Sequence, residues 1–136
     1  MAIKTLIKEY YITSDGTKFE DMQQAKEYEE HIESLGSVIL LDNCCNSLST
    51  KQLELAQSVE DAYFVYAPTV EARGAIREEF SGYSNPFAET HTNMVFWDWG
   101  KDEWRDLEYV IEEYKSKIDY LQKAKKKIEE LAAARA

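Results

Sequence analysis

The stretch Met94–Trp99, with the sequence MVFWDW, decides the fold, because a strand pattern passes here into a long helical pattern. Aromatic and β-branched residues dominate the stretch, and Gly100 follows it, as is typical of the end of a β-strand. From Lys101 to about Ala133 the sequence predicts one continuous helix with acidic residues near its N-terminal end. We therefore expect the chain to end in a strand and a long helix.

A seam of apolar side chains follows this predicted helix in alternating steps of three and four residues. Its positions are Trp104, Leu107, Ile111, Tyr114, Ile118, Leu121, Lys125 and Ile128. This spacing is that of a coiled coil over about three heptads, weakened where Lys125 intrudes. Two uses fit the seam. It covers the chain's own sheet, or it joins copies of the chain, since a helix rising ~1.5 Å per residue projects beyond so small a sheet.

Upstream of Met94, short strand patterns alternate with short helical patterns. We predict strands at 3–13, 37–41 and 62–66, and helices at 21–35, 50–58 and 70–80. The continuous apolar run at 37–41 favours a strand buried on both faces, and polar loops are expected at 43–47 and 81–93. Ser49 with Gln52 forms a capping box for the second helix, and Thr69 caps the third. The predicted fold class is α+β, a small and mostly antiparallel sheet with short helices and one long C-terminal helix.

Length and charge restrict the class of protein. The 136 residues suit a single domain, 1–136, with an α/β core over 1–100 and the long helix over 101–134. The formal charge of −10 repels a phosphate backbone, which argues against non-specific binding of nucleic acid. No apolar run approaches the ~20 residues that cross a bilayer, so we expect no membrane contact and a cytoplasmic location. The adjacent Cys44 and Cys45 are expected to be reduced thiols.

The sequence carries no recognisable catalytic or metal-binding pattern. Its two histidines, His31 and His91, lie outside known catalytic motifs. Two adjacent cysteines and two distant histidines lack the spacing of a zinc site, which needs about four ligands. Glycine-rich phosphate loops are also missing. We therefore expect no cofactor and no enzymatic activity, although an enzyme with an unfamiliar site stays an alternative.

Aromatic residues concentrate between Tyr83 and Arg105, where all three tryptophans lie. Strand alternation places Trp97 and Trp99 on one face and Asp98 on the other. Either these aromatic side chains are core, or a ligand or partner covers them, since a base stacked on such a ring contributes about 1–3 kcal/mol. The predicted ligand-binding residues are Phe87, Asn93, Trp97, Asp98, Trp99, Arg105, Lys117, Arg73 and Arg77. In this set the arginines suit phosphate, and the amide and the carboxylate suit base edges.

The segments Tyr10–Phe19, Asp61–Tyr66 and Phe96–Asp98 resemble small phage accessory proteins. The order of strands before a long C-terminal helix is similar to that of the anti-Thoeris proteins, phage sponges that sequester cyclic ADP-ribose signals in pockets between subunits. The resemblance makes Phe87, Asn93 and Asp98 counterparts of pocket residues. Where that family has a pair of arginines on the last helix, this chain has Glu113 and Lys117.

Two functions follow as expectations. The first is a viral anti-defence protein that sequesters a small nucleotide immune signal, of the cyclic ADP-ribose type or a cyclic oligonucleotide, as a homo-oligomer joined through the final helix. The second is an acidic inhibitor of the anti-CRISPR or DNA-mimic type, which blocks a host immune protein by direct binding. The acidic cluster at 27–33 motivates the second function.

Overall fold

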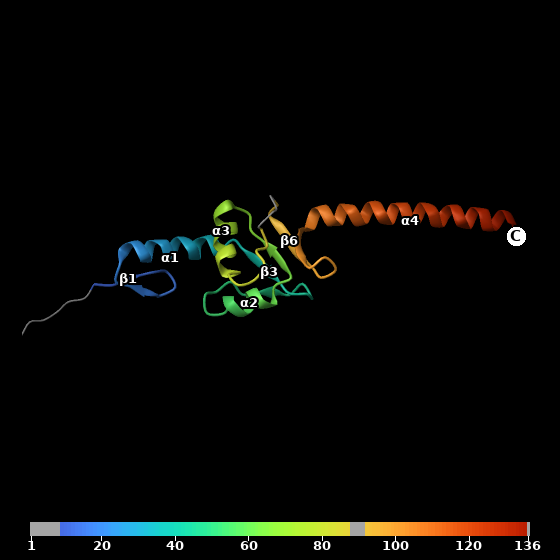
Figure 1. The fold of residues 1–136 in the computed structure, drawn as a ribbon. Helices are drawn as coiled ribbons and strands as arrows, with labels where there is room; N and C mark the ends of the chain where they lie inside the picture. The colour runs from blue at the N-terminus through green and yellow to red at the C-terminus, as the bar shows by residue number, and fades with distance from the viewer. Residues whose placement is uncertain (1–8, 88–91, 136) are drawn as a thin grey trace, which may run out of the picture.

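The computed structural model describes residues 9–87 and 92–135, and Figure 1 shows an elongated molecule. A small hairpin and α1 (Met22–Leu35) lie at one end, and a five-stranded sheet lies in the middle. The last helix, α4 (Leu107–Arg135), extends away from the sheet at the other end. These elements confirm the predicted α+β class, with antiparallel sheets and a long C-terminal helix.

The N-terminal hairpin consists of β1 (Tyr11–Ile12) and β2 (Lys18–Phe19). Its turn contains Gly16 at φ 87°, a conformation that glycine adopts without strain. The Asp15 carboxylate accepts hydrogen bonds from the Thr13 hydroxyl at 2.6 Å and the Tyr28 hydroxyl at 2.7 Å, which hold the pKa of Asp15 well below its ordinary value. These bonds tie the hairpin to α1. Of the strand predicted at 3–13, residues 3–8 lie outside the described residues.

The main sheet has the strand order β4-β3-β5-β6-β7, and every neighbouring pair is antiparallel. The strands are β3 (Ile39–Leu41), β4 (Ser47–Leu48), β5 (Phe64–Tyr66), β6 (Met94–Asp98) and β7 (Glu103–Asp106). The register sets Leu40, Val65 and Val95 beside one another on one face. Their side chains form the core together with residues of α2 (Leu55–Asp61) and α3 (Val70–Glu79).

The opposite face of the sheet carries apolar side chains that stay partly exposed. By the same register these are Ile39, Leu41, Phe64, Tyr66, Met94 and Phe96. Ile39 is 48% exposed, so the prediction that 37–41 is buried on both faces is wrong. That prediction fits a parallel sheet covered on both sides, whereas an antiparallel sheet can leave one face open.

The turns before β4 and α2 differ from those that the sequence predicts. Asp42 accepts hydrogen bonds from the backbone N–H groups of Cys44 and Asn46, and the tight turn that results lets β4 begin at Ser47, the last residue of the expected loop. The Ser49 hydroxyl accepts from Lys51 N–H, so it stabilises a turn, and α2 begins at Leu55 instead of Thr50. The side chain of Thr69 caps α3 as predicted, by accepting from Ala72 N–H.

The long helix begins at Leu107, not at Lys101 as the sequence predicted. Residues Glu103–Asp106 instead form β7, which pairs with β6 in a hairpin and sets Trp104 opposite Trp97. Burying the indole of Trp104 against the core outweighs the weak helical preference of the charged residues around it. The Asp106 carboxylate then accepts from Tyr109 N–H at 3.0 Å, which caps the start of α4.

Candidate functional site: an aromatic pocket

A pocket of about 270 Å³ lies beside β6 and β7, where the end of α3 and the end of α2 approach them. We call it the aromatic pocket. The residues that line it are Val59, Glu60, Ala62, Tyr63, Phe80, Tyr83, Ser84, Trp97, Trp99 and Trp104. All three tryptophans of the chain therefore meet at one site.

The rings of the aromatic pocket hold one another edge to face. The ring of Trp97 lies 5.8 Å from that of Trp99 and 5.5 Å from that of Trp104, with interplanar angles of 84° and 71°. Trp104 also meets Phe80 at 5.6 Å, and Trp99 meets Tyr63 at 6.0 Å. Aromatic pairs prefer such tilted and T-shaped arrangements. The rings therefore form an apolar wall that is already in place without a ligand.

The rim of the pocket is open to water, and its polar groups are few. Trp99 is 67% exposed and Tyr83 is 58% exposed. The indole N–H of Trp104 donates to the backbone oxygen of Ser84 at 3.1 Å, whereas that of Trp97 is buried with no acceptor among the described residues. Among the described residues, Glu60 is the one charged side chain that lines the pocket. The site thus suits a flat apolar group and not an anion.

The structure brings only two of the predicted binding residues into this pocket, Trp97 and Trp99. Phe87 lies in the core with 3% of its surface exposed, so its expected place in a ligand site is corrected to packing. Asn93 lies just before β6, where its side-chain oxygen accepts from the Arg73 guanidinium at 2.6 Å. Arg73 also donates to the backbone oxygen of Ala67, so this pair ties α3 to the sheet.

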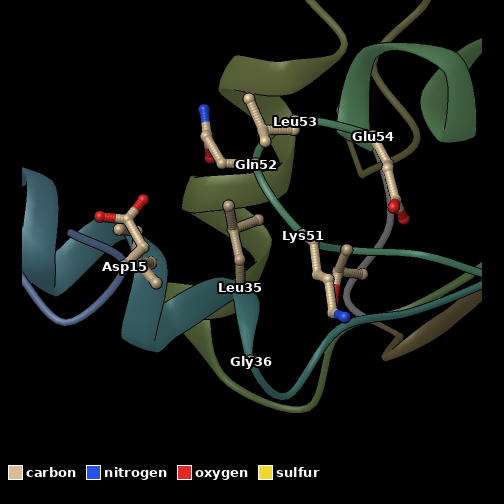
Figure 2. A pocket seen from close by; sticks show the side chains of 9 residues that line it. Asp15, Leu35, Gly36, Lys51, Gln52, Leu53 and Glu54 are labelled. Carbon is tan, nitrogen blue, oxygen red and sulfur yellow. The ribbon is translucent and has the colours of Figure 1, made fainter. Parts of the chain in front are cut away.

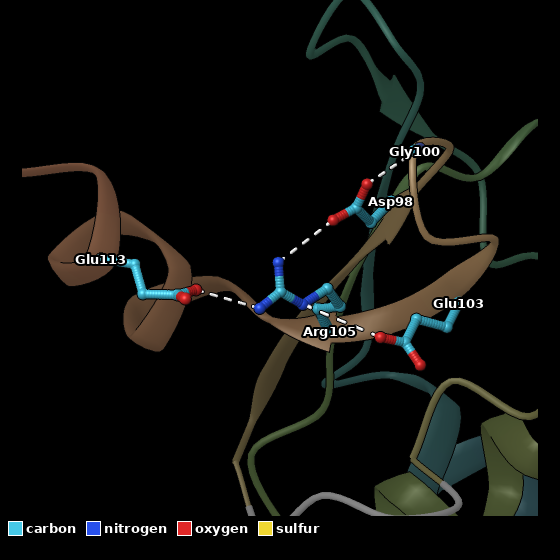
Figure 3. Close-up of polar contacts among 5 residues, drawn as sticks. All are labelled: Asp98, Gly100, Glu103, Arg105 and Glu113. Carbon is cyan, nitrogen blue, oxygen red and sulfur yellow. Dashed lines mark hydrogen bonds and ion pairs between the residues drawn. The ribbon is translucent and has the colours of Figure 1, made fainter. Parts of the chain in front are cut away.

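Asp98 and Arg105 lie on the face of the sheet opposite Trp97 and Trp104, as the register requires. The guanidinium of Arg105 binds the carboxylates of Asp98 at 3.2 Å and Glu113 at 3.0 Å, with Glu103 at 4.0 Å (Figure 3). Burial opposes ionisation, but these carboxylates still raise the pKa of Arg105. Burial would likewise raise the pKa of Asp98, but hydrogen bonds from Arg105 and the Gly100 N–H lower it. Arg105 is therefore held by carboxylates on the face of the sheet opposite the aromatic pocket, and its expected role as a phosphate ligand stays a prediction.

The remaining predicted residues lie apart from the aromatic pocket. Arg77 is exposed on α3, and Lys117 is exposed on α4. Sequence reasoning missed Tyr63, which directly precedes β5, and Phe80, which directly follows α3. Only the sheet register could have found Tyr63, because its backbone oxygen accepts from Trp97 N–H at 2.8 Å.

Two further cavities have other characters. One of about 400 Å³ is lined by Leu35, Lys51 and Glu54 among others, and Figure 2 shows that its charged groups do not converge on a common point. Its Asp15 carboxylate is held by the hairpin. The other is a groove of about 880 Å³ between α1 and α3, with several glutamates along it. Neither cavity assembles the groups of a catalytic site that we recognise.

The described residues contain no group of three or more His, Cys, Asp and Glu side chains placed to hold a metal ion. His91 lies outside the described residues, and Cys44 and Cys45 are exposed thiols. Within the described ranges, no helix has both the length and the apolar character needed to cross a bilayer. Comparison of the chain with protein-family models, curated proteins and solved structures finds no match.

Proposed function

We propose that this chain is a binding protein that takes one flat ring, of the nucleobase kind, into the aromatic pocket. The exposed indole of Trp99, held against Trp97 and Tyr63 beside a cavity, is the observation that carries this proposal. A base stacked on such a ring contributes about 1–3 kcal/mol and covers apolar surface that otherwise faces water. Binding of a base therefore covers the apolar ring surface that the free pocket exposes to water.

The size and charge of the pocket favour a ligand that inserts a single ring and keeps its other groups outside. Its volume of about 270 Å³ lies just below the roughly 300–1,000 Å³ of sites that enclose a whole drug-sized ligand. Glu60 would repel a phosphate group inside the pocket. A nucleotide ligand therefore binds through its base and keeps its phosphates outside the aromatic wall.

The finer proposal is that the ligand is a nucleotide immune signal, of the cyclic ADP-ribose type or a cyclic oligonucleotide. As a viral anti-defence protein, the chain would bind this signal inside the host cell and sequester it without changing it chemically. The resemblance of the sequence to anti-Thoeris sponges supports this step, together with a pocket of the size of one base.

Isothermal titration calorimetry with adenosine, cyclic ADP-ribose and a cyclic dinucleotide tests both steps. Adenosine should bind, and Trp99→Ala should weaken its binding by about five- to 150-fold. Tyr120→Ala, at an exposed aromatic residue of α4, is the matched control and should change nothing. If adenosine binds and neither cyclic nucleotide does, the signal assignment is wrong. No heat and no change in Tm with all three ligands would remove the pocket's function as well.

A second candidate function is inhibition of a host immune protein through the groove between α1 and α3. Five glutamates line this groove, Glu27, Glu30, Glu33, Glu71 and Glu78. A surface of this charge attracts the basic groove of a nucleic-acid enzyme. The triple change Glu27→Gln, Glu30→Gln and Glu33→Gln should abolish salt-sensitive capture of such an enzyme from host lysate. A lysate that yields no partner for the wild-type chain at low salt counts against this function.

A further inference from the structure

The apolar seam of α4 lies beyond the sheet and faces water. Only the start of α4 approaches β6 and β7, and Val110 is the one buried residue described in this helix. Farther along, Ile118 is 52% exposed and Leu121 is 55% exposed, and Ile128 is exposed as well. From Ile111 onward the seam therefore does not cover the chain's own sheet, and its apolar side chains have no packing partner among the described residues.

The spacing of the seam points to another helix with the same repeat. From Leu107 to Ile128 the seam positions alternate in steps of four and three residues, which averages to the 3.5-residue repeat of a coiled coil. This repeat keeps one stripe facing a partner helix along its whole length, and a second copy of α4 carries the matching stripe. Identical chains are the commonest source of such a partner.

We propose that two copies of this chain pair through α4 in an antiparallel coiled coil centred between Ile118 and Leu121. Ile118 of one copy then packs on Leu121 of the other, and Ile111 packs on Ile128. In the layer between these two, Tyr114 faces Lys125. Every apolar seam residue from Ile111 to Ile128 thereby gains a partner.

Lys125 selects the direction of pairing. In a parallel pair with the same register, Lys125 meets Lys125 of the second copy, and two ammonium groups repel each other at the apolar seam. In the antiparallel pair, Lys125 lies against the ring of Tyr114, which attracts a cation within about 6 Å of its centre. The ion pair of Lys125 with Glu129 at 3.5 Å lies within the same helix and is compatible with this position.

The distribution of charge along α4 favours the same direction. Acidic residues gather near its start, at Glu108, Glu112 and Glu113, and four lysines lie between Lys123 and Lys127. Antiparallel pairing sets the acidic start of one helix beside the basic half of the other, and it also opposes the two helix dipoles. Parallel pairing sets like charge beside like charge.

The two sheets of the dimer then lie at opposite ends of the coiled coil, each with its own aromatic pocket. The pairing does not depend on what the aromatic pocket binds, so the two proposals fail separately. Sedimentation equilibrium of the full chain should give twice its mass of 15.8 kDa. Ile118→Glu should give a monomer, and Tyr120→Glu, on the same helix but off the seam, should stay a dimer. A wild-type monomer, or a larger assembly, would overturn the proposal.

Opposite charges at Tyr114 test the direction. Tyr114→Glu faces Lys125 of the second copy and should keep the dimer, whereas Tyr114→Lys should weaken it by at least about a hundredfold. Adding Lys125→Glu to Tyr114→Lys should restore the dimer. Equal loss from both Tyr114 variants would overturn antiparallel pairing, because a parallel pair sets like charges together in either case. Urea unfolding followed by tryptophan fluorescence should show an unchanged core in each variant, since the substituted seam positions lie outside the core.

Discussion

Replacing Trp104 by alanine should destabilise the fold, because its indole closes the core between β7 and α3. The ring packs on Phe80 at 5.6 Å and Trp97 at 5.5 Å, and its N–H donates to the backbone of Ser84. Truncating a buried tryptophan to alanine costs about 3–5 kcal/mol. Because Trp104 is only partly buried, we expect the lower end, about 3 kcal/mol. Trp104→Phe keeps a ring but loses the donor, and should cost about 1–2 kcal/mol.

Urea unfolding, followed by the fluorescence of the remaining tryptophans, measures this free energy. Trp99→Ala is the matched variant, because Trp99 belongs to the same pocket but is mostly exposed, and it should cost less than about 1 kcal/mol. Trp104→Ala should therefore shift the unfolding midpoint far more than Trp99→Ala. Equal shifts for the two variants would refute the placement of Trp104 on a strand against the core.

Three further changes test other parts of the structure. Phe87→Ala should cost about 3–5 kcal/mol in urea unfolding, because the ring is core, and an unchanged midpoint would contradict that place. Gly82→Ala should cost about 1 kcal/mol in the same assay. Gly82 has φ 90°, and a Cβ added there meets no atom within 4 Å, so the cost comes from backbone strain alone. A stabilised variant would argue against that φ. The pKa of Asp98 is lowered, so its ionised form stabilises the fold above the pKa of the unfolded chain, about 4, and this contribution is lost as the pH falls toward the folded value. In the Asp98→Asn variant the free energy of unfolding should therefore fall less steeply with pH below about 4 than it does in the wild-type chain. The same pH dependence in both would contradict the ion pair with Arg105.

Elements with complete local signals were predicted well from the sequence. The helices α1 and α3 begin at the capping residues Asp21 and Thr69, whose side chains accept from the first backbone N–H groups. The apolar periods of these helices are also local, so no distant residue was needed to recognise them. The Gly16 turn follows from the same kind of short-range information.

Elements that depend on distant partners were missed. Lys101–Asp106 resembles a helix start by composition, and only pairing with β6 reveals a strand. Without that hairpin, sequence alone cannot reveal the ion pair between Arg105 and Asp98. Strand alternation did place Trp97 and Trp99 on one side. Phe80 lies beside the tryptophans only because α3 packs on the sheet, and no local sequence pattern encodes that packing.

The indole N–H signals of Trp97, Trp99 and Trp104 provide the most direct test of the aromatic pocket, since the chain has no other tryptophan. In a ¹H–¹⁵N correlation spectrum, added adenosine should shift the signals of Trp97 and Trp99 and leave the side-chain signal of Arg105, on the far face of the sheet, in place. If all three indole signals stay unchanged at a large excess of adenosine, the pocket does not take a nucleobase.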